Sequence, residues 1–509
     1  MKTLIKNAAV FDGSGAEASD LDILIDNDTI AEVGKVSDST ADEIIDANGF
    51  SAAPGFIDCH SHSDISILAA PEAFGKISQG VTSEVVGNCG LSVFPVTDFN
   101  REHLDELYRN YNEKITWDSL TGYREELRKR HPAINIFSLC GHNTLRAAVN
   151  GYESKELTPK QLDDMRRLLR KSLSEGACGL STGLLYSPGK FSDSNELRTL
   201  LSETASAKKP YATHLRSEGK MLIEAITEAI SLCNESGTEK LHISHLKTAG
   251  KDNWHKLDDA LSLIDSSRRK KLSITADRYP YIESMTQLCV VLPPPFDNMD
   301  SVALQKNLAD DATFEKLISS LAETVSNERW NNIILVDCAP ERFKKYSGST
   351  ILEIAGHESL KPEFACSSIL RLDAPGALAA FRGMSLENMK KIISLPSVCC
   401  ASDENARPLD FSIGRSHPRA FGSFPRFFRI LDSMNVPRGE IIRKMTSLPA
   451  SIFGLSGRGM IKKGFKADIV LFDPDTYDSS ATFAKPHSPA EGIRSVFVNG
   501  KEVYTDQSC

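Results

Sequence analysis

Short segments in which apolar and polar residues alternate are concentrated at the two ends of the chain. Turn residues separate these segments, which is the pattern of antiparallel β-strands. They cover residues 3–5, 22–25 and 30–33 near the start, and 467–472 and 496–501 near the end. Because both ends are rich in strand signals, we expect them to form one small β-sandwich domain from residues 1–54 and 455–509.

The middle of the chain alternates apolar runs of strand length with helical patterns, such as those over 159–175 and 220–236. The expected strands are 56–62, 82–86, 135–139, 179–182, 211–214, 241–245, 272–276 and 398–402. Eight strands separated by helices are typical of a (β/α)8 TIM-like barrel. The sequence therefore predicts an α/β fold with this barrel over residues 55–287 and 347–454.

Residues 288–346 are surplus to that strand count. This stretch contains three consecutive prolines, Pro293 to Pro295, and an amphipathic run over 314–325. We therefore expect it to be an insertion before the last barrel strand.

Composition narrows the class of protein. With 509 residues, of which 41% are hydrophobic, the chain can form a large core. Its 59 Lys and Arg against 68 Asp and Glu residues give a net charge of -9, which argues against a nucleic-acid-binding surface. No apolar run approaches the ~20 residues of a membrane span, and the apolar part of the start is too short for a signal peptide. Eleven cysteines, an odd number, do not suggest a disulfide framework, so we expect a cytoplasmic protein.

Two histidines, His60 and His62, directly follow the first apolar run of the middle region. In an extended strand, residues i and i+2 point to the same face, so both imidazoles can reach one ion at the end of the strand. The alternative is a polar turn that happens to carry two histidines.

Other expected strands also end in residues that bind metals. These residues are Cys89 after the second strand, His214 after the fifth, His245 after the sixth and Asp403 after the eighth. On a barrel, side chains at the carboxyl ends of the strands converge on one mouth. A single buried histidine is more often a packing residue, but this set is hard to explain by packing. Histidine, cysteine and aspartate together suit zinc.

These motifs resemble the amidohydrolase superfamily and, within it, the N-acyl-D-amino-acid deacylase (D-aminoacylase) family. The matching segments are 54–64, 87–90, 141–146, 180–189, 214, 245–247, 277–281, 402–403 and 417–419. The most specific are Cys89, the run from Ser181 to Gly189 and His-Pro-Arg at 417–419. The resemblance implies a barrel with a small β domain and a zinc-dependent deacylase acting on a small N-acyl-D-amino acid. It implies no nucleic-acid or membrane partner, and leaves the oligomeric state open.

The resemblance also implies the ligand set. Many superfamily members use a carbamylated lysine on strand four, where this chain reads Cys178-Gly179-Leu180-Ser181-Thr182 without a lysine. Cys89 would then take the bridging role, although it could also be an ordinary buried thiol. One tight zinc is expected at Cys89, His214 and His245. A second, weaker or empty position is expected near His60, His62 and Asp403.

Further residues are assigned to catalysis and recognition. The resemblance gives Asp403 the role of general base and makes Tyr186 a phenolic donor to the oxyanion. A cationic clamp for the substrate's α-carboxylate is expected from Arg419 and Lys247, because a guanidinium matches a carboxylate and Lys247 lies two residues past His245. Tyr279 is expected to supply a third hydrogen-bond donor. The alternatives are a packed aromatic for Tyr186 and a surface charge for Arg419. Arg278 and Arg426 are weaker candidates.

The chain departs from the family pattern at two places. The family tends to carry small residues with a serine and a threonine where this chain has Ile282-Glu283-Ser284-Met285-Thr286. We therefore count Ser284 and Met285 as candidate substrate contacts. The segment 405–416 also differs, so the preferred side chain and acyl group stay open.

Two other functions compete with deacylation. One is hydrolysis of a cyclic amide, as in enzymes of the dihydropyrimidinase or dihydroorotase type. The absent lysine on strand four and the presence of Arg419 argue against it. The other is a non-catalytic binding protein on the same fold, which the complete ligand set disfavours.

Overall fold

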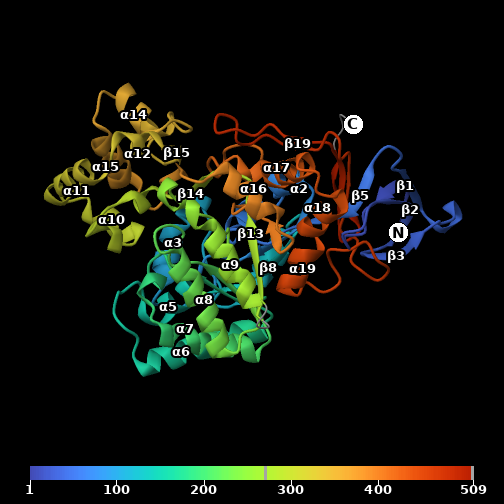
Figure 1. Ribbon diagram of the computed structural model, residues 1–509, viewed down its shortest axis with the longest axis horizontal. Coiled ribbons are helices and arrows are strands. Elements are labelled where there is room, and N and C mark those ends of the chain that lie inside the picture. Colours follow the sequence, from blue (N-terminus) through green and yellow to red (C-terminus); the bar gives the residue numbers. More distant parts are fainter. Residues whose placement is uncertain (269–271, 506–509) are drawn as a thin grey trace.

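One sheet of eight strands joins the two ends of the chain. The structure, a computed structural model, describes residues 1–268 and 272–505, so residues 506–509 of the expected β domain lie outside the described residues. The strands are β1 (Lys2–Val10), β2 (Ser19–Asp26), β3 (Thr29–Gly34), β4 (Glu43–Asp46), β5 (Ser51–Pro54), β18 (Ile469–Phe472), β21 (Ile493–Val498) and β22 (Lys501–Thr505). The antiparallel pairing of β5 with β18 connects the two ends. Figure 1 shows the N-terminal strands, in blue, and the red ribbon of the C-terminal part at the same side of the molecule.

Nine short strands form two parallel sheets in the middle of the chain. The first sheet has the order β6 (Phe56–Asp58), β7 (Val81–Val86), β8 (Asn135–Ser138). The second contains β9 (Cys140–Gly141), β10 (Leu180–Gly183), β11 (Tyr211–His214), β12 (Lys240–Ile243), β13 (Ser273–Arg278) and β17 (Val398–Cys400). Each of the eight segments expected as strands overlaps one of these, and the α/β character predicted from the sequence is confirmed.

The two parallel sheets adjoin along both of their outer edges. Only Leu139 separates β8 from β9, and its N–H donates to the carbonyl of Val86 at 2.9 Å. At the other edge, the N–H of Asp403 donates to the carbonyl of His60 at 2.8 Å. The candidate ligands after β6 and β17 are therefore held side by side by main-chain hydrogen bonds.

Helices connect and cover the parallel strands. They include α4 (Leu120–Arg130), α5 (His142–Asn150), α6 (Pro159–Ser174), α7 (Ser194–Ser206), α8 (Leu222–Ser236), α9 (Leu257–Arg268), α16 (Leu386–Ser394), α17 (Arg419–Ser433), α18 (Arg438–Met445) and α19 (Ser447–Phe453). Helix α6 begins with a capping box between Thr158 and Gln161 and has Pro159 in its first turn. Helix α8 ends at Gly237, which adopts the left-handed conformation. Both helices lie within the ranges that periodicity predicts.

A separate unit lies at the upper left of Figure 1, far from the eight-stranded sheet. It contains a three-stranded antiparallel sheet of β14 (Glu283–Gln287), β16 (Leu378–Arg382) and β15 (Ile333–Asp337). Its helices are α10 (Ser301–Asn307), α11 (Asp311–Thr324), α12 (Asn327–Asn331), α13 (Glu341–Lys344), α14 (Ile351–His357) and α15 (Pro362–Asp373). The amphipathic run at 314–325 falls largely in α11, where Phe314, Leu317 and Leu321 are buried.

This unit runs past the expected range 288–346 at both ends. The reason is β16, which is the central strand of the small sheet and pairs with both β14 and β15. The unit also has its own hydrophobic cluster, extending from Leu288 to Ala379. Within residues 1–268 and 272–505, no helix combines the length and apolar character that a membrane span requires.

Candidate metal centre

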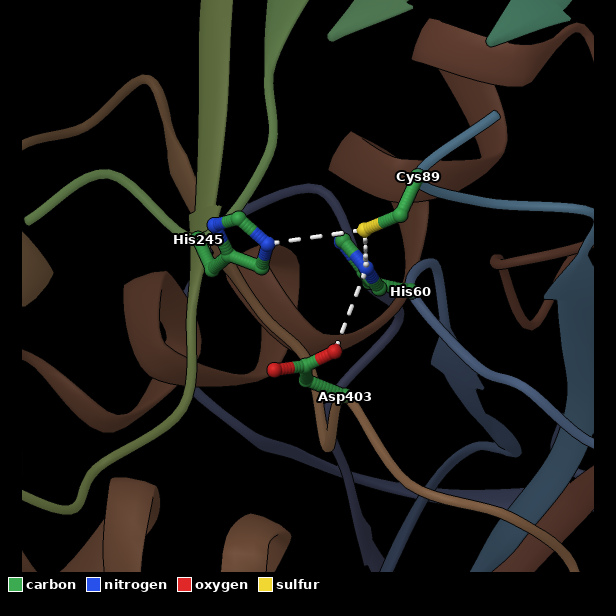
Figure 2. A group of neighbouring side chains, drawn as sticks. All are labelled: His60, Cys89, His245 and Asp403. Carbon is green, nitrogen blue, oxygen red and sulfur yellow. Dashed lines mark hydrogen bonds and ion pairs between the residues drawn. The ribbon is translucent and has the colours of Figure 1, made fainter. Parts of the chain in front are cut away.

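Four candidate ligands meet at the carboxyl ends of the parallel strands. The ligand atoms of His60, Cys89, His245 and Asp403 all lie within 4.8 Å of one another. The Sγ atom of Cys89 is 3.2 Å from Nε2 of His60 and 3.5 Å from Nε2 of His245. Oδ1 of Asp403 lies 3.4 Å from Nε2 of His60. Figure 2 shows the four side chains pointing toward one another from different segments of the chain.

The backbone at three of these residues has an unusual conformation. Cys89, His245 and Asp403 have φ values of 52°, 36° and 53°, in the left-handed region that non-glycine residues seldom occupy. Each follows its strand within a few residues. Next to Cys89, an added Cβ on Gly90 would lie 2.2 Å from Oδ1 of Asn143, so only glycine fits there. The chain thus bends sharply at these positions, as functional sites often require.

The two remaining candidate ligands lie beside this group. Nε2 of His62 is 3.1 Å from Oδ1 of Asp403. The ring centroid of His214 is 4.5 Å from that of His245. His214 is buried, and neither of its ring nitrogens has a hydrogen-bond partner in the part of the chain that the structure describes. An unpartnered buried imidazole next to imidazole, thiol and carboxylate donors fits a zinc ion.

Electrostatics favour the anionic forms of the donors. Burial alone raises the pKa of the Cys89 thiol, but the neighbouring His60 and His245 hold that pKa well below its ordinary value. Burial likewise raises the pKa of Asp403, and the Arg419 guanidinium, with Nη1 2.8 Å from Oδ2, reverses the effect and holds this pKa well below its usual range. The group therefore offers a thiolate and a carboxylate to a cation.

Two carboxylates that the sequence analysis did not assign hold the histidines. Oδ2 of Asp277 lies 3.0 Å from Nδ1 of His60 and 2.9 Å from Nε2 of His242. Oε1 of Glu218 lies 2.8 Å from Nδ1 of His245. Metal-binding histidines commonly donate their second N–H to a carboxylate in this way. The available signal was weak: Asp277 directly follows an expected strand, and Glu218 follows His214 by four residues.

A buried lysine, Lys76, connects three of the parallel strands near the ligand group. Nζ of Lys76 is 2.7 Å from Oδ2 of Asp58, 2.6 Å from Oε1 of Glu84 and 2.8 Å from Oγ of Ser402. All four side chains are fully buried. Because Asp58, Glu84 and Ser402 lie on or next to β6, β7 and β17, this network fixes the relative position of the segments that carry His60 and Asp403.

A cavity of about 850 Å³ opens beside the ligand group. Its wall combines strand-end segments of the parallel sheets with β14 and other parts of the separate unit. All residues assigned to catalysis and recognition from the sequence line it, namely Tyr186, Lys247, Tyr279, Ser284, Met285, Asp403 and Arg419. Arg278 and Arg426 are not part of the wall. Arg278 donates instead to the carbonyl of Tyr281, and Arg426 to that of Pro280.

Arg419 and Tyr279 form a stacked pair in the cavity wall. Arg419 is 1% exposed, so the alternative of a surface charge is excluded. Its guanidinium carbon lies 4.6 Å from the centroid of the Tyr279 ring. The Tyr279 hydroxyl is buried and has no hydrogen-bond partner among the described residues. A buried cation and an unused hydroxyl at one wall can bind a substrate carboxylate.

Tyr186 keeps its proton in this environment. Burial and the adjacent Cys89 raise the pKa of the Tyr186 phenol well above its ordinary value. Its ring centroid is 4.9 Å from that of His214. The hydroxyl can therefore act as a hydrogen-bond donor next to the ligand group.

Ser284 and Met285 lie on β14 and point to opposite faces because side chains alternate along a strand. Thr286 shares the face of Ser284 and lies close enough to Tyr186 to interact with its hydroxyl. Met285 packs against a small buried cluster that contains Ile334 and Val336. The segment 405–416 borders the same cavity, and Arg407 holds it by donating to the carbonyl of Ile413 at 2.6 Å.

Comparisons with known proteins bear on this site. The model of the amidohydrolase family matches residues 43–190 and 353–504. The D-aminoacylase of Alcaligenes xylosoxydans xylosoxydans is 31% identical, over 99% of this chain and 95% of that protein. The N-acyl-D-glutamate deacylase of the same organism is 29% identical, over 98% of this chain and 93% of that protein.

Solved structures give the same picture. One is an N-acyl-D-glutamate deacylase from Bordetella bronchiseptica in complex with zinc and a phosphonate inhibitor that mimics the tetrahedral intermediate. It superposes with a TM-score of 0.82 at 29% sequence identity, and the match covers 99% of this chain and 96% of that one. A D-aminoacylase described as having a binuclear metal centre gives a TM-score of 0.81 at 31% sequence identity, and the match covers 99% of this chain and 97% of that one. The dihydropyrimidinase of Brevibacillus agri gives a TM-score of 0.53 at 17% sequence identity, and the match covers 100% of this chain and 96% of that one. This likeness concerns the fold alone.

Proposed function

This chain belongs to the amidohydrolase family, and from that premise we propose that it is a zinc-dependent hydrolase of N-acyl-D-amino acids. The reaction would cleave a C–N bond other than a peptide bond and release a carboxylate and a free D-amino acid. One observation carries this proposal: His60, Cys89, His245 and Asp403 converge beside the buried Arg419, in a chain similar over its whole length to deacylases.

The finer architecture is part of the proposal. The two parallel sheets would form one (β/α)8 barrel, with a small β-sandwich domain from both termini and an insertion before the last strand. The hydrogen bond between Asp403 and His60 supports closure, because it joins the last parallel strand to the first. A cytoplasmic location is supported by the ten cysteines of the described residues, all of which are free thiols.

The proposed zinc site keeps the ligand set expected from the sequence. Cys89, His214 and His245 would hold one tight ion, and His60, His62 and Asp403 would border a second position. Strand β10 has no lysine that could be carbamylated, so Cys89 would be the bridging ligand. The ion held by these residues would supply Lewis-acid polarisation of the scissile carbonyl and activation of water.

The chain's own residues would move the proton and bind the oxyanion. Asp403, as a carboxylate, accepts the proton of the attacking water and returns it to the leaving amine. Its lowered pKa keeps it ionised at neutral pH. The Tyr186 hydroxyl, which stays protonated, donates to the developing oxyanion.

Recognition of the substrate would rest on other residues of the cavity wall. Arg419 offers a planar fork for the α-carboxylate, and Tyr279 adds its unused hydroxyl. Lys247 lies at the same wall, and Ser284 presents a hydroxyl from β14. The substrate would thus be fixed by its carboxylate while its amide faces the ligand group.

The test is a paired screen of N-acetyl-D- and N-acetyl-L-amino acids, read by release of the free amine. We expect zinc-loaded protein to hydrolyse D substrates and to discriminate against their L enantiomers. Protein dialysed against a chelator is the control and should be inactive until zinc is restored. Absence of amine release, preference for L substrates, or turnover of a cyclic amide instead would each overturn the proposal.

A further inference from the structure

His245 is held from both sides of its ring. Nε2 lies 3.5 Å from Sγ of Cys89. On the other side, Nδ1 lies 2.8 Å from Oε1 of Glu218 and 2.8 Å from Nζ of Lys247. The orientation that directs Nε2 to Cys89 is therefore coupled to the Glu218–Lys247 pair.

Glu218 contacts three functional side chains at once. Its carboxylate hydrogen-bonds the ammonium of Lys247, faces Nδ1 of His245, and lies 3.7 Å from Nε2 of His214. The side chain is 14% exposed and lines the cavity. It lies between β11 and α8, four residues past His214 in the sequence.

Glu218 could also be a metal ligand, because the donor atoms of His214, Glu218 and His245 lie within 4.8 Å of one another. The position of Lys247 argues against this role. Its ammonium hydrogen-bonds the Glu218 carboxylate and also lies 2.8 Å from Nδ1 of His245, so a cation is already bound to this carboxylate. Glu218 therefore has its charge balanced within the protein.

We propose that Glu218 is a positioning residue for the zinc site, acting through two effects. Together with the Lys247 ammonium that it binds, its carboxylate holds Nδ1 of His245 at 2.8 Å and so directs Nε2 toward Cys89. It also neutralises Lys247, whose ammonium would otherwise repel a divalent cation next to the ring. This inference rests on the proposed function only in taking zinc as the ion.

A second consequence concerns Lys247. Lys247 is expected from its position in the sequence to bind the substrate carboxylate, but its ammonium is paired with Glu218. An incoming carboxylate must share Lys247 with Glu218 or replace it. Arg419, in contrast, has an Nε atom without a hydrogen-bond partner among residues 1–268 and 272–505.

The test measures zinc affinity by competition with a chromophoric chelator, which does not depend on activity. Glu218→Ala should weaken zinc binding about 10–100-fold, the usual effect of losing a carboxylate behind a metal-binding histidine. Glu218→Gln keeps an acceptor without the charge and should fall between Glu218→Ala and the unaltered protein. The double variant Glu218→Ala/Lys247→Met should recover part of the loss, because the unbalanced ammonium is also removed.

Glu196→Ala is the matched control. Glu196 is also buried and hydrogen-bonds a histidine, with Oε1 2.8 Å from Nε2 of His142, but this pair lies outside the ligand group. Zinc affinity should be unchanged in this variant. Should Glu218→Ala fail to fold, as judged by thermal unfolding of the metal-free protein, Glu218→Gln alone decides the question.

Two results would overturn the inference: zinc binding by Glu218→Gln as tight as in the unaltered protein, or a double variant no better than Glu218→Ala. An unaltered protein that binds no zinc would overturn it as well. If the unaltered protein binds zinc but hydrolyses no N-acyl-D-amino acid, the proposed activity fails while the role of Glu218 is still measured.

Discussion

Nη1 of Arg419 lies 2.8 Å from Oδ2 of Asp403, so the proposed carboxylate clamp and the proposed general base form one ion pair. The other oxygen, Oδ1, faces His60 and His62 at 3.4 and 3.1 Å. Substitution of either member of the pair therefore changes the environment of the other. Experiments on this site must separate proton transfer from substrate binding.

Replacement of Asp403 tests proton transfer. Asp403→Asn should lower kcat by about 10²–10⁴-fold, because an amide cannot accept a proton from water. Zinc at Cys89, His214 and His245 should be retained. Turnover and zinc content are measured on the same sample, with Asp297→Asn, in the same cavity wall, as the control. Turnover near that of the unaltered protein, with full zinc, would exclude Asp403 as the base.

Replacement of Cys89 tests the bridging ligand. Cys89→Ala should lose the tight zinc and the activity with it, because the group has no second thiolate. Zinc content after dialysis, measured by elemental analysis, reports the loss. Cys233→Ala, at a buried cysteine in α8, should keep zinc and activity. The bridging assignment is wrong if the Cys89 variant retains both.

The fold was predictable where the signal is local. Apolar runs bounded by turns predict the parallel strands, and the helical pattern over 159–175 predicts α6. The extent of the separate unit was not predictable, because it depends on the pairing of Ser284 with Phe381 across sheet β14–β16. Periodicity carries no information about such distant partners.

The candidate ligands could be identified from the sequence, because each follows an expected strand and parallel strands place their ends together. Glu218 gave no comparable signal, because a glutamate in a connecting segment normally faces solvent. Only its contacts with His245 and Lys247 reveal its place. The surroundings of Met285 could not be predicted either, because the face of β14 on which it lies depends on strand register.

Asp64 should make stability depend on pH. Burial raises the pKa of this carboxyl to about 7, and Oδ1 has no hydrogen-bond partner in the described part of the chain. Between the ordinary pKa of ~3.9 and 7, the folded state holds the proton and the unfolded state does not, so the free energy of unfolding falls as pH rises. Asp64→Asn should therefore stabilise the protein above pH 7, by a few kcal/mol at most, and should make little difference near pH 4.

Denaturant unfolding at pH 4, 6 and 8, with zinc removed from both proteins, measures this difference. Asn can still accept the hydrogen bond that the N–H of Gly87 donates to Asp64. An advantage of the variant that is equal at all three pH values would show that Asp64 does not titrate in this range.

Replacement of Arg419 tests recognition of the α-carboxylate. Arg419→Met should cost about 2–4 kcal/mol in kcat/KM for an N-acyl-D-amino acid, the scale of a lost charge-assisted contact in a closed site. Part of this loss comes through Asp403, whose pKa the guanidinium lowers. That part should also appear with a substrate whose α-carboxylate has been converted to an amide.

The contribution of the clamp is therefore the excess loss for the acid over the amide, obtained from both proteins with both substrates. Arg419→Lys serves as the matched variant, because it keeps the charge near Asp403 but loses the planar fork. It should preserve turnover of the amide better than Arg419→Met and still bind the acid poorly. Equal losses for acid and amide in Arg419→Met would mean that Arg419 acts only by holding Asp403. The α-carboxylate would then have to be bound by Tyr279 and by a Lys247 released from Glu218.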